Sequence, residues 1–353
     1  MLALPLGTNI SGYVVTGILG RGGFGVTYKG QDTSTGRDVA IKEYFPQDIA
    51  IRQYGFVQAT SPAEVADFQK GKIDFLQEAK TLAMCNHPSI VRVLGFFEQF
   101  GTAYIVMEFI SGETLHNLVE NSYKNGMTEK QIKNWLGQII DALDVVHKKG
   151  LTHRDVKPEN ILIRPNGNAV LIDFGAAKQI TARNSVFTSV TLTHGYAPPE
   201  QYDTTAKHIG SWTDIYALGA TIFFAMTGGT IPPRAIDRMN ATSQTPQQED
   251  PLKPMMNKLC AGNKFSQNFL IAVQKMLAIS LNERLKSISE VKGIISGFEP
   301  TKRRKIEQEK TSQKLPQEVP IKQNDNNELL LLKIIIGILS FVVVACMLSI
   351  LSR

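Results

Sequence analysis

Two short stretches in the middle of the chain carry residues suited to chemistry. Residues 153–160 read HRDVKPEN, and Asp173 begins the tripeptide DFG eighteen residues after Asp155. A carboxylate such as Asp155 can accept or orient the proton of a hydroxyl group. Asn160 and Asp173 offer the oxygen ligands that Mg²⁺ requires, although an isolated Asn or Asp before a glycine is usually a turn former. By residue type, the two stretches therefore offer one possible proton acceptor and two possible oxygen ligands for a metal ion.

A glycine-rich stretch near the start of the chain indicates phosphate binding. Gly20, Gly22 and Gly25 follow the spacing G-x-G-x-x-G, and glycine lets backbone amides approach phosphates where a Cβ would collide. A flexible loop would explain the glycines equally well. In a dinucleotide-binding turn the last glycine opens a helix, and a P-loop continues with Lys and Ser or Thr. Residues 26–28 read VTY, which favours a strand, so we predict a turn between two antiparallel strands.

The surrounding elements are predicted from periodicity. Residues 1–111 show strand patterns and one helical stretch at 65–85, with a strand ending near Lys42. Residues 112–298 are dominated by helical patterns, which include 131–150 and 213–229, and the strand patterns at 161–167 and 169–175 predict a hairpin that positions Asn160 and Asp173. The fold class is therefore α+β.

The ordered motifs GRGGFG, VAIK, HRDVKPEN, DFG, GYAPPE and DIYALG resemble those of the protein kinase family, of the serine/threonine type, over about residues 13–290. The segments VAIKEYFP and GYAPPEQY resemble those of bacterial members of the family. The resemblance implies a two-lobed kinase domain over residues 13–298, with an N-lobe over about 13–111 and a C-lobe over about 112–298. It also implies ATP with Mg²⁺, or Mn²⁺, in the cleft and protein substrates with Ser or Thr hydroxyls.

The resemblance assigns roles to the polar residues. Lys42 meets the α- and β-phosphates and is held by Glu78, which alone would be read as a solvated helix residue. Asp155 is the catalytic base, and Lys157 steadies the transferred phosphate. Asn160 and Asp173 are the metal ligands.

The resemblance also predicts the nucleotide pocket. Apolar side chains would cover the adenine, a gatekeeper would close the back, and the hinge at residues 108–110 would offer backbone hydrogen bonds. These positions, with the three glycines, are Leu19, Gly20, Gly22, Gly25, Ala40, Lys42, Met107, Glu108, Ile110 and Leu162.

A regulatory role is implied for Arg154 and for the loop after DFG. An arginine beside the catalytic aspartate commonly grips a phosphate on that loop, because its planar fork binds phosphate bidentately. We predict autophosphorylation of at least one of Ser185, Thr188, Ser189 and Thr191, with Thr188 and Thr191 favoured. Thr193 is expected to contact Asp155 and Lys157, or else to cap a turn.

Three structural expectations complete the resemblance. Glu200 should pair with Arg284, Asp214 should brace the backbone of the HRD loop, and His153 should be a packed scaffold residue. The connection over residues 46–72 is unusually long. It is interpreted as an ordered insertion, with a regulatory or docking element as the alternative.

The C-terminal part differs in composition. Residues 299–328 are polar and proline-punctuated, which is typical of a linker, and residues 329–351 are predicted to form a transmembrane helix because no charge occurs from Ile334 to Leu351. Basic residues precede this segment, which places the kinase domain in the cytoplasm at a cell (inner) membrane. A buried C-terminal helix is the alternative.

Composition excludes several classes. A hydrophobic fraction of 43% with 20% charged residues indicates a globular protein, and a formal charge of +6 is too modest to predict nucleic-acid binding. Three dispersed cysteines indicate a reducing compartment and no disulfide framework.

The rival functions are a pseudokinase that serves as a membrane scaffold, with or without bound nucleotide, and a small-molecule kinase. Tethering to a membrane would favour self-association and autophosphorylation between neighbours.

Overall fold

The computed structural model describes residues 3–23, 25–173, 194–202, 208–244 and 249–296, and the chain divides into compact units at 1–300 and 301–353. All described residues belong to the first unit. The predicted linker at 299–328, the predicted transmembrane helix at 329–351 and Ser185, Thr188, Ser189, Thr191 and Thr193 lie outside the described residues. No helix within the described ranges combines the length and apolarity needed to cross a bilayer.

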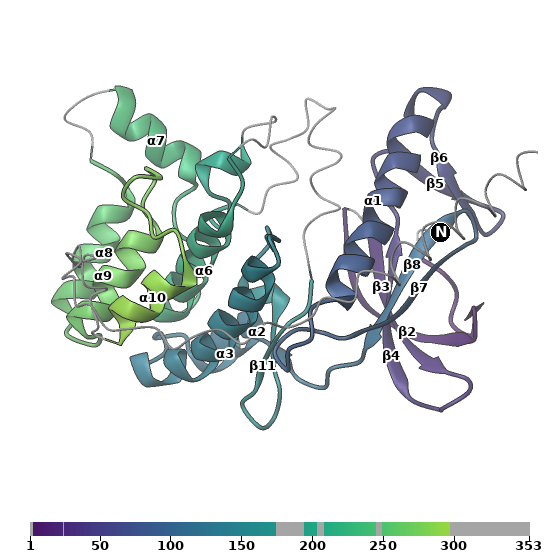
Figure 1. The fold of residues 1–353 in the computed structure, drawn as a ribbon, viewed down its shortest axis with the longest axis horizontal. Coiled ribbons are helices and arrows are strands. Elements are labelled where there is room, and N and C mark those ends of the chain that lie inside the picture. Colours follow the sequence, from purple (N-terminus) through teal and green to yellow (C-terminus); the bar gives the residue numbers. More distant parts are fainter. Residues whose placement is uncertain (1–2, 24, 174–193, 203–207, 245–248, 297–353) are drawn as a thin grey trace, which may run out of the picture. The chain divides into compact units, whose positions relative to one another are not determined.

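The first part of the chain forms an antiparallel sheet. Its six strands lie in the order β1-β2-β3-β4-β8-β7, so that β4 is central and next to β8 (Figure 1). Their bounds are β1 Asn9–Ile10, β2 Tyr13–Gly22, β3 Gly25–Asp32, β4 Asp38–Tyr44, β7 Val93–Gln99 and β8 Thr102–Glu108. Alternating side chains of β3 and β4 are buried, as expected for strands that pack one face on a core.

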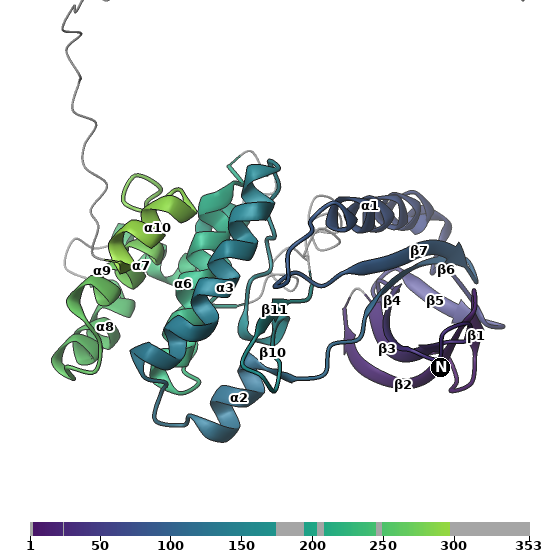
Figure 2. The ribbon, with the colours of Figure 1, turned by 60° about the horizontal axis from the view of Figure 1, so that its bottom comes forward.

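Helix α1 (Val65–Ala83) packs along the sheet beside β7 and β8, as both views show (Figure 1, Figure 2). Its buried face includes Phe68, Phe75 and Glu78. Gly71 lies where the helix passes over Tyr44, because a Cβ at this position would lie 1.9 Å from the Tyr44 hydroxyl oxygen. The absence of a side chain at Gly71 thus allows α1 to approach the sheet closely.

The long connection before α1 forms regular secondary structure. It contains the two-stranded hairpin of β5 (Ala50–Gln53) and β6 (Phe56–Ala59), followed by the short helix η1 (Pro62–Glu64). The hairpin turn uses Tyr54 and Gly55, both with positive φ. The sequence analysis predicted no strands in this connection.

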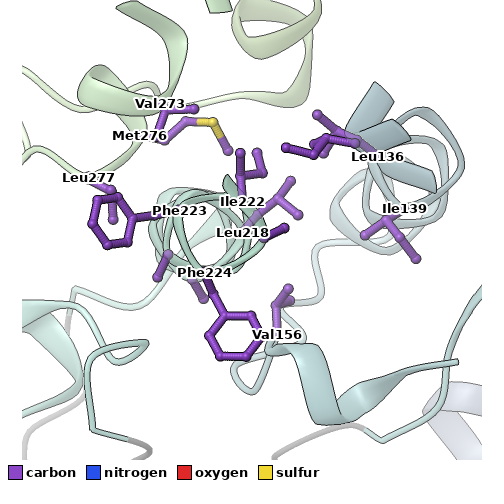
Figure 3. Close-up of a cluster of buried hydrophobic side chains, with 14 of the residues drawn as sticks. Leu136, Ile139, Val156, Leu218, Ile222, Phe223, Phe224, Val273, Met276 and Leu277 are labelled. Carbon is purple, nitrogen blue, oxygen red and sulfur yellow. The ribbon is translucent and has the colours of Figure 1, made fainter. Parts of the chain in front are cut away.

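The second part of the chain is helical. Its elements are α2 (Leu115–Ser122), α3 (Glu129–Lys148), α6 (Ser211–Thr227), α7 (Ala235–Gln244), α8 (Leu252–Ala261), α9 (Gln267–Met276), α10 (Ile288–Ile295) and the short helices η2 (Pro158–Asn160) and η3 (Pro199–Gln201). Thr128 caps α3 through a capping box with Gln131, and Gly228 ends α6 in the left-handed conformation. Helix α6 is the centre of the core, where Phe223 lies beside Leu277, and Leu218 and Ile222 lie on the side that faces α3 (Figure 3).

A small sheet joins the helical part to the catalytic stretches. Strand β10 (Ile161–Ile163) pairs antiparallel with β11 (Ala169–Leu171) and with β9 (Glu113–Thr114). Asn160 directly precedes β10, and Asp173 follows β11 by two residues. The predicted two-lobed architecture, with a β-rich N-lobe and a helical C-lobe, is therefore confirmed.

Candidate active site

A cavity of about 340 Å³ lies between the β-sheet and the small β9–β10–β11 sheet. It contains eight of the ten predicted nucleotide-pocket positions and both predicted metal ligands. These residues are Leu19, Gly20, Ala40, Lys42, Met107, Glu108, Ile110, Leu162, Asn160 and Asp173. Apolar walls with a few polar groups at one end are typical of a small-molecule site.

Gly22 and Gly25, the other two predicted pocket positions, are not among the lining residues. A Cβ at Gly20 or Gly22 would have no neighbour within 4 Å, so both leave open space beside the turn. A Cβ at Gly25 would lie 2.0 Å from the carbonyl oxygen of Glu43, so this glycine lets β3 pair closely with β4. Gly25 is therefore needed for the pairing of two strands, whereas Gly20 and Gly22 leave room beside the turn.

Lys42 projects from β4 toward the second lobe. Its Nζ lies 2.5 Å from Oδ1 of Asp173 and 5.8 Å from the ring centroid of Phe75 on α1. Burial alone would lower the pKa of Lys42, but the carboxylates of Asp173, Glu78 and Asp155 outweigh this effect and raise the pKa above its ordinary value. The Lys42 ammonium therefore stays charged among the carboxylates of Asp173, Glu78 and Asp155.

The expected partnership of Lys42 with Glu78 is present as an electrostatic interaction. Glu78 is 8% exposed on the inner face of α1, and its charge raises the pKa of Lys42. The short contact of Lys42 with Asp173 was not expected from the sequence. No sequence signal indicates this pairing, because 131 residues separate the two partners.

Asp155 is the centre of a second group of polar side chains. It is 6% exposed, and its Oδ2 accepts a hydrogen bond from Nδ2 of Asn160 at 2.8 Å and lies 3.2 Å from Nζ of Lys157. Nδ2 of Asn160 also donates to the Asp155 carbonyl oxygen at 2.8 Å. The structure thus brings together the three residues that the HRDVKPEN stretch predicted.

The donor set fits a magnesium ion. Asn160 uses its amide nitrogen on Asp155, so the amide oxygen is the atom left for a metal, and Asp173 supplies a carboxylate in the same cavity. In the described ranges no cluster of three or more His, Cys, Asp or Glu side chains is placed to hold a metal. Magnesium suits such a site, because it commonly takes one or two protein oxygens and completes its octahedron with phosphates and water.

Asp214 in the first turn of α6 braces the HRD loop, as predicted. Its carboxylate is fully buried and accepts hydrogen bonds from the backbone N–H groups of His153 at 2.8 Å and Arg154 at 2.7 Å. Nε2 of His147 lies 2.7 Å from the same carboxylate. Arg154 has a φ of 70°, which is strained for a residue with a Cβ, and the two backbone bonds stabilise this conformation.

His153 is completely buried, in agreement with the predicted scaffold role. Its Nδ1 accepts a hydrogen bond from the backbone N–H of Asp155 at 3.3 Å. The imidazole thereby supports the loop that carries Asp155.

The predicted pair of Glu200 and Arg284 is also present. Nη1 of Arg284 lies 2.7 Å from Oε1 of Glu200, and both side chains are almost fully buried. Arg284 donates further bonds to the carbonyl oxygens of Ala278 and Ile279. This pair ties the GYAPPE segment to the end of the helical lobe.

Several lining residues were not predicted. They are Thr27, Val91, Gly112, Thr114, Glu159 and Ile172, whereas Phe109 belongs to the predicted hinge. Thr27 follows the last glycine of the turn by two residues, and Ile172 directly precedes Asp173, so both could be found from their distance to the motifs. Val91 had no such signal, because only the tertiary fold brings it next to β11.

Comparison with known families gives one match over most of the chain. The family described as protein kinase domain matches residues 13–293. A similar solved structure, described as the apo form of PpkA-294, shares 33% sequence identity with a TM-score of 0.72 and covers 84% of this chain and 100% of its own. The kinase domain of Mycobacterium tuberculosis PknI, at 22% identity and a TM-score of 0.59, covers 84% of this chain and 98% of its own and shares the fold.

Curated relatives include two bacterial proteins. Serine/threonine-protein kinase B of Synechocystis sp. is 33% identical over 79% of this chain and 45% of its own length. A probable serine/threonine-protein kinase of Streptomyces coelicolor is 29% identical over 69% of this chain and 34% of its own length. The chain thus spans less than half the length of either relative.

Proposed function

The chain belongs to the protein kinase family, and from this premise we propose that it is a serine/threonine protein kinase. It would transfer the γ-phosphoryl group of ATP to Ser or Thr hydroxyls of proteins. The observation that carries this proposal is that Lys42, Asp173 and Asn160 line one cavity, with Asp155 hydrogen-bonded to Asn160. Phosphoryl transfer depends mainly on positioning and on neutralising phosphate charge, and these residues supply both.

The residues divide the work by their chemistry. Lys42 would bind the α- and β-phosphates, and the charges of Asp173 and Glu78 favour its ammonium form. Asp155 would accept or orient the proton of the substrate hydroxyl, and Lys157, 3.2 Å from that carboxylate, would neutralise charge on the transferred group. Asn160 and Asp173 would hold Mg²⁺, which when bound neutralises charge on the phosphate oxygens.

The apolar residues would hold the base. Leu19, Ala40 and Leu162 would cover the adenine faces, and Met107, which is 6% exposed, would close the back of the pocket. Glu108 and Ile110 lie at the hinge and would offer backbone hydrogen bonds. Gly20 and Gly22, which leave open space beside the turn, would let backbone amides approach the phosphates.

Specificity for Ser and Thr is proposed from Lys157 and from the relatives. Lys157 stands two residues after Asp155, where the serine/threonine type of the family carries lysine. Both curated bacterial relatives are described as serine/threonine kinases. The rival functions are a nucleotide-binding pseudokinase scaffold and a small-molecule kinase.

The proposal is tested by incubating the purified protein with γ-labelled ATP, Mg²⁺ and three otherwise identical basic peptides that contain Ser, Thr or Tyr. We expect label on the Ser and Thr peptides, strongly reduced by removal of Mg²⁺, and little label on the Tyr peptide. Nucleotide binding without any transfer would instead support the pseudokinase. Transfer to small alcohols or sugars but to no protein or peptide would support the small-molecule kinase.

We propose that residues 329–351 anchor the kinase in a membrane, with the kinase domain in the cytoplasm. The support is the uncharged run from Ile334 to Leu351, together with the basic residues that precede it. A tether of this kind would raise the local concentration of kinase domains and favour self-association.

Deletion of residues 329–353 is expected to release the protein from the membrane fraction. The full chain should resist extraction with alkaline carbonate, because a spanning helix is held by its buried apolar surface. Fractionation followed by immunoblotting measures both, and equal extraction of the two proteins would contradict the anchor. Kinase activity per molecule toward a free peptide should be the same in both once the loop after DFG is phosphorylated to the same extent.

We propose that autophosphorylation on Thr188 or Thr191 activates the protein. Arg154, beside the catalytic aspartate, would grip the added phosphate bidentately, and Thr193 would contact Asp155 and Lys157. Phosphopeptide mass spectrometry after incubation with Mg·ATP should find one or both threonines modified, faster at higher protein concentration. An active protein without phosphate on this loop would argue against the proposal.

A further inference from the structure

The connection between β4 and α1 contacts the glycine-rich turn, although the proposed function gives this connection no role. Gln47 follows β4 by three residues. Its backbone N–H donates to the carbonyl oxygen of Gly23 at 2.9 Å, and its side-chain Nε2 donates to the carbonyl oxygen of Gly22 at 2.7 Å. One residue therefore binds two consecutive carbonyl groups at the turn between β2 and β3.

The two acceptors belong to Gly22 and Gly23, where the described residues leave open space beside the backbone. A Cβ built at Gly22 or Gly23 would meet nothing within 4 Å. Such a turn is free to move unless hydrogen bonds hold it, because glycine restricts its backbone very little. The bonds from Gln47 lie next to this open space, which the proposed function assigns to the phosphates.

Gln47 is itself held by a well-anchored segment. Phe45 and Pro46, directly before it, are buried. After it, the N–H of Ile49 bonds to the carbonyl oxygen of Pro46, and the N–H of Thr60 bonds to the carbonyl oxygen of Ile49. The start of the connection is thus hydrogen-bonded to the residue that directly follows β6.

A buried ion pair fixes the β5–β6 hairpin to the strand that carries Lys42. Nη2 of Arg52 lies 2.7 Å from Oε2 of Glu43, which is completely buried. The hydroxyl groups of Tyr28 and Tyr104 donate to the same carboxylate at 2.7 and 2.6 Å. The guanidinium also lies 5.4 Å from the ring centroid of Phe45. The hairpin is therefore tied to β4 and to Phe45, which lies two residues before Gln47.

We propose that Gln47 is a positioning residue that holds the glycine-rich turn in place for nucleotide binding. This inference rests on the proposed function, and it gives the long connection between β4 and α1 a role in binding ATP. Gln47 acts through the backbone of Gly22 and Gly23 and does not itself touch the reacting atoms.

The inference is tested with Gln47→Met and Gln47→Glu in the full chain. Both variants keep the length of the side chain and remove its N–H donors, and only the second adds a charge. Gln58→Glu is the matched control, because Gln58 is exposed on β6 of the same connection and bonds to Gln53. The two readouts are the Kd of a fluorescent ATP analogue with Mg²⁺ and hydrogen exchange of the turn amides without nucleotide.

We expect Gln47→Met to raise the Kd and the KM for ATP about 3- to 10-fold, the loss of one hydrogen bond. The kcat at saturating ATP should change less than about twofold, and exchange at the turn should become faster. Gln58→Glu should leave all of these values unchanged. An unchanged Kd for Gln47→Met, whether or not exchange at the turn becomes faster, would overturn the inference. A wild-type protein that binds no nucleotide would overturn the proposed function as well.

Discussion

Replacement of Asp155 by Asn is expected to lower kcat for phosphoryl transfer by about 10²- to 10⁴-fold, the usual contribution of a positioned acid or base. The amide has the size of the carboxylate but cannot accept a proton from the substrate hydroxyl. An amide oxygen can still accept the hydrogen bond that Asn160 now donates at 2.8 Å, so the loop should keep its conformation. Nucleotide affinity should therefore change little.

The measurement is steady-state transfer to a Ser peptide, together with the Kd for the ATP analogue. Asp144→Asn is the matched control, because Asp144 forms a surface pair with Lys148 on α3 and should not affect kcat. If Asp155→Asn retained wild-type turnover, the assignment of Asp155 as the base would be wrong. If it lost nucleotide binding instead, the residue would be acting on the fold of the site.

Replacement of Arg284 by Met is expected to lower the free energy of unfolding by about 3–5 kcal/mol, because Glu200 would be left as an uncompensated buried charge. The guanidinium lies 2.7 Å from Glu200 and 4.9 Å from the ring centroid of Tyr216, and Thr213 also donates to the same carboxylate oxygen at 3.0 Å. Loss of the guanidinium breaks its contacts with Glu200 and with Tyr216 at once.

Urea denaturation measures this loss, with two comparison variants. Adding Glu200→Gln to Arg284→Met should recover part of the stability, since no buried charge then remains unpaired. Lys292→Met breaks the exposed pair of Lys292 with Asp141 and should cost at most about 1 kcal/mol. Equal effects of the buried and the exposed substitution would show that the Glu200–Arg284 pair does not hold the lobe together.

Much of the catalytic site could be predicted from the sequence because its residues belong to short, ordered motifs. Asp155, Lys157 and Asn160 occupy one stretch of eight residues, so local backbone geometry brings them together. Helix α1 was predicted from its apolar spacing, and it begins and ends within two residues of the predicted bounds. The catalytic residues depend on a local motif and the helix on short-range periodicity, and a single sequence shows both well.

Other features depend on contacts between distant residues, and the sequence did not indicate them. The contact of Lys42 with Asp173 and the bonds of Gln47 to Gly22 and Gly23 exist only because the sheet brings remote segments together. The hairpin of β5 and β6 was missed because its strands have four residues each and only a short alternation. The role of Gly25 differs from that of Gly20, which only the register of β3 on β4 reveals.

Calorimetric titration of the purified full chain with a non-hydrolysable ATP analogue, with and without Mg²⁺, tests the central claim most directly. The account predicts one saturable site per chain, whose affinity depends on Mg²⁺ and is strongly reduced in Lys42→Met and in Asp173→Asn. No saturable binding, or binding that neither Mg²⁺ nor these two substitutions affect, would contradict it.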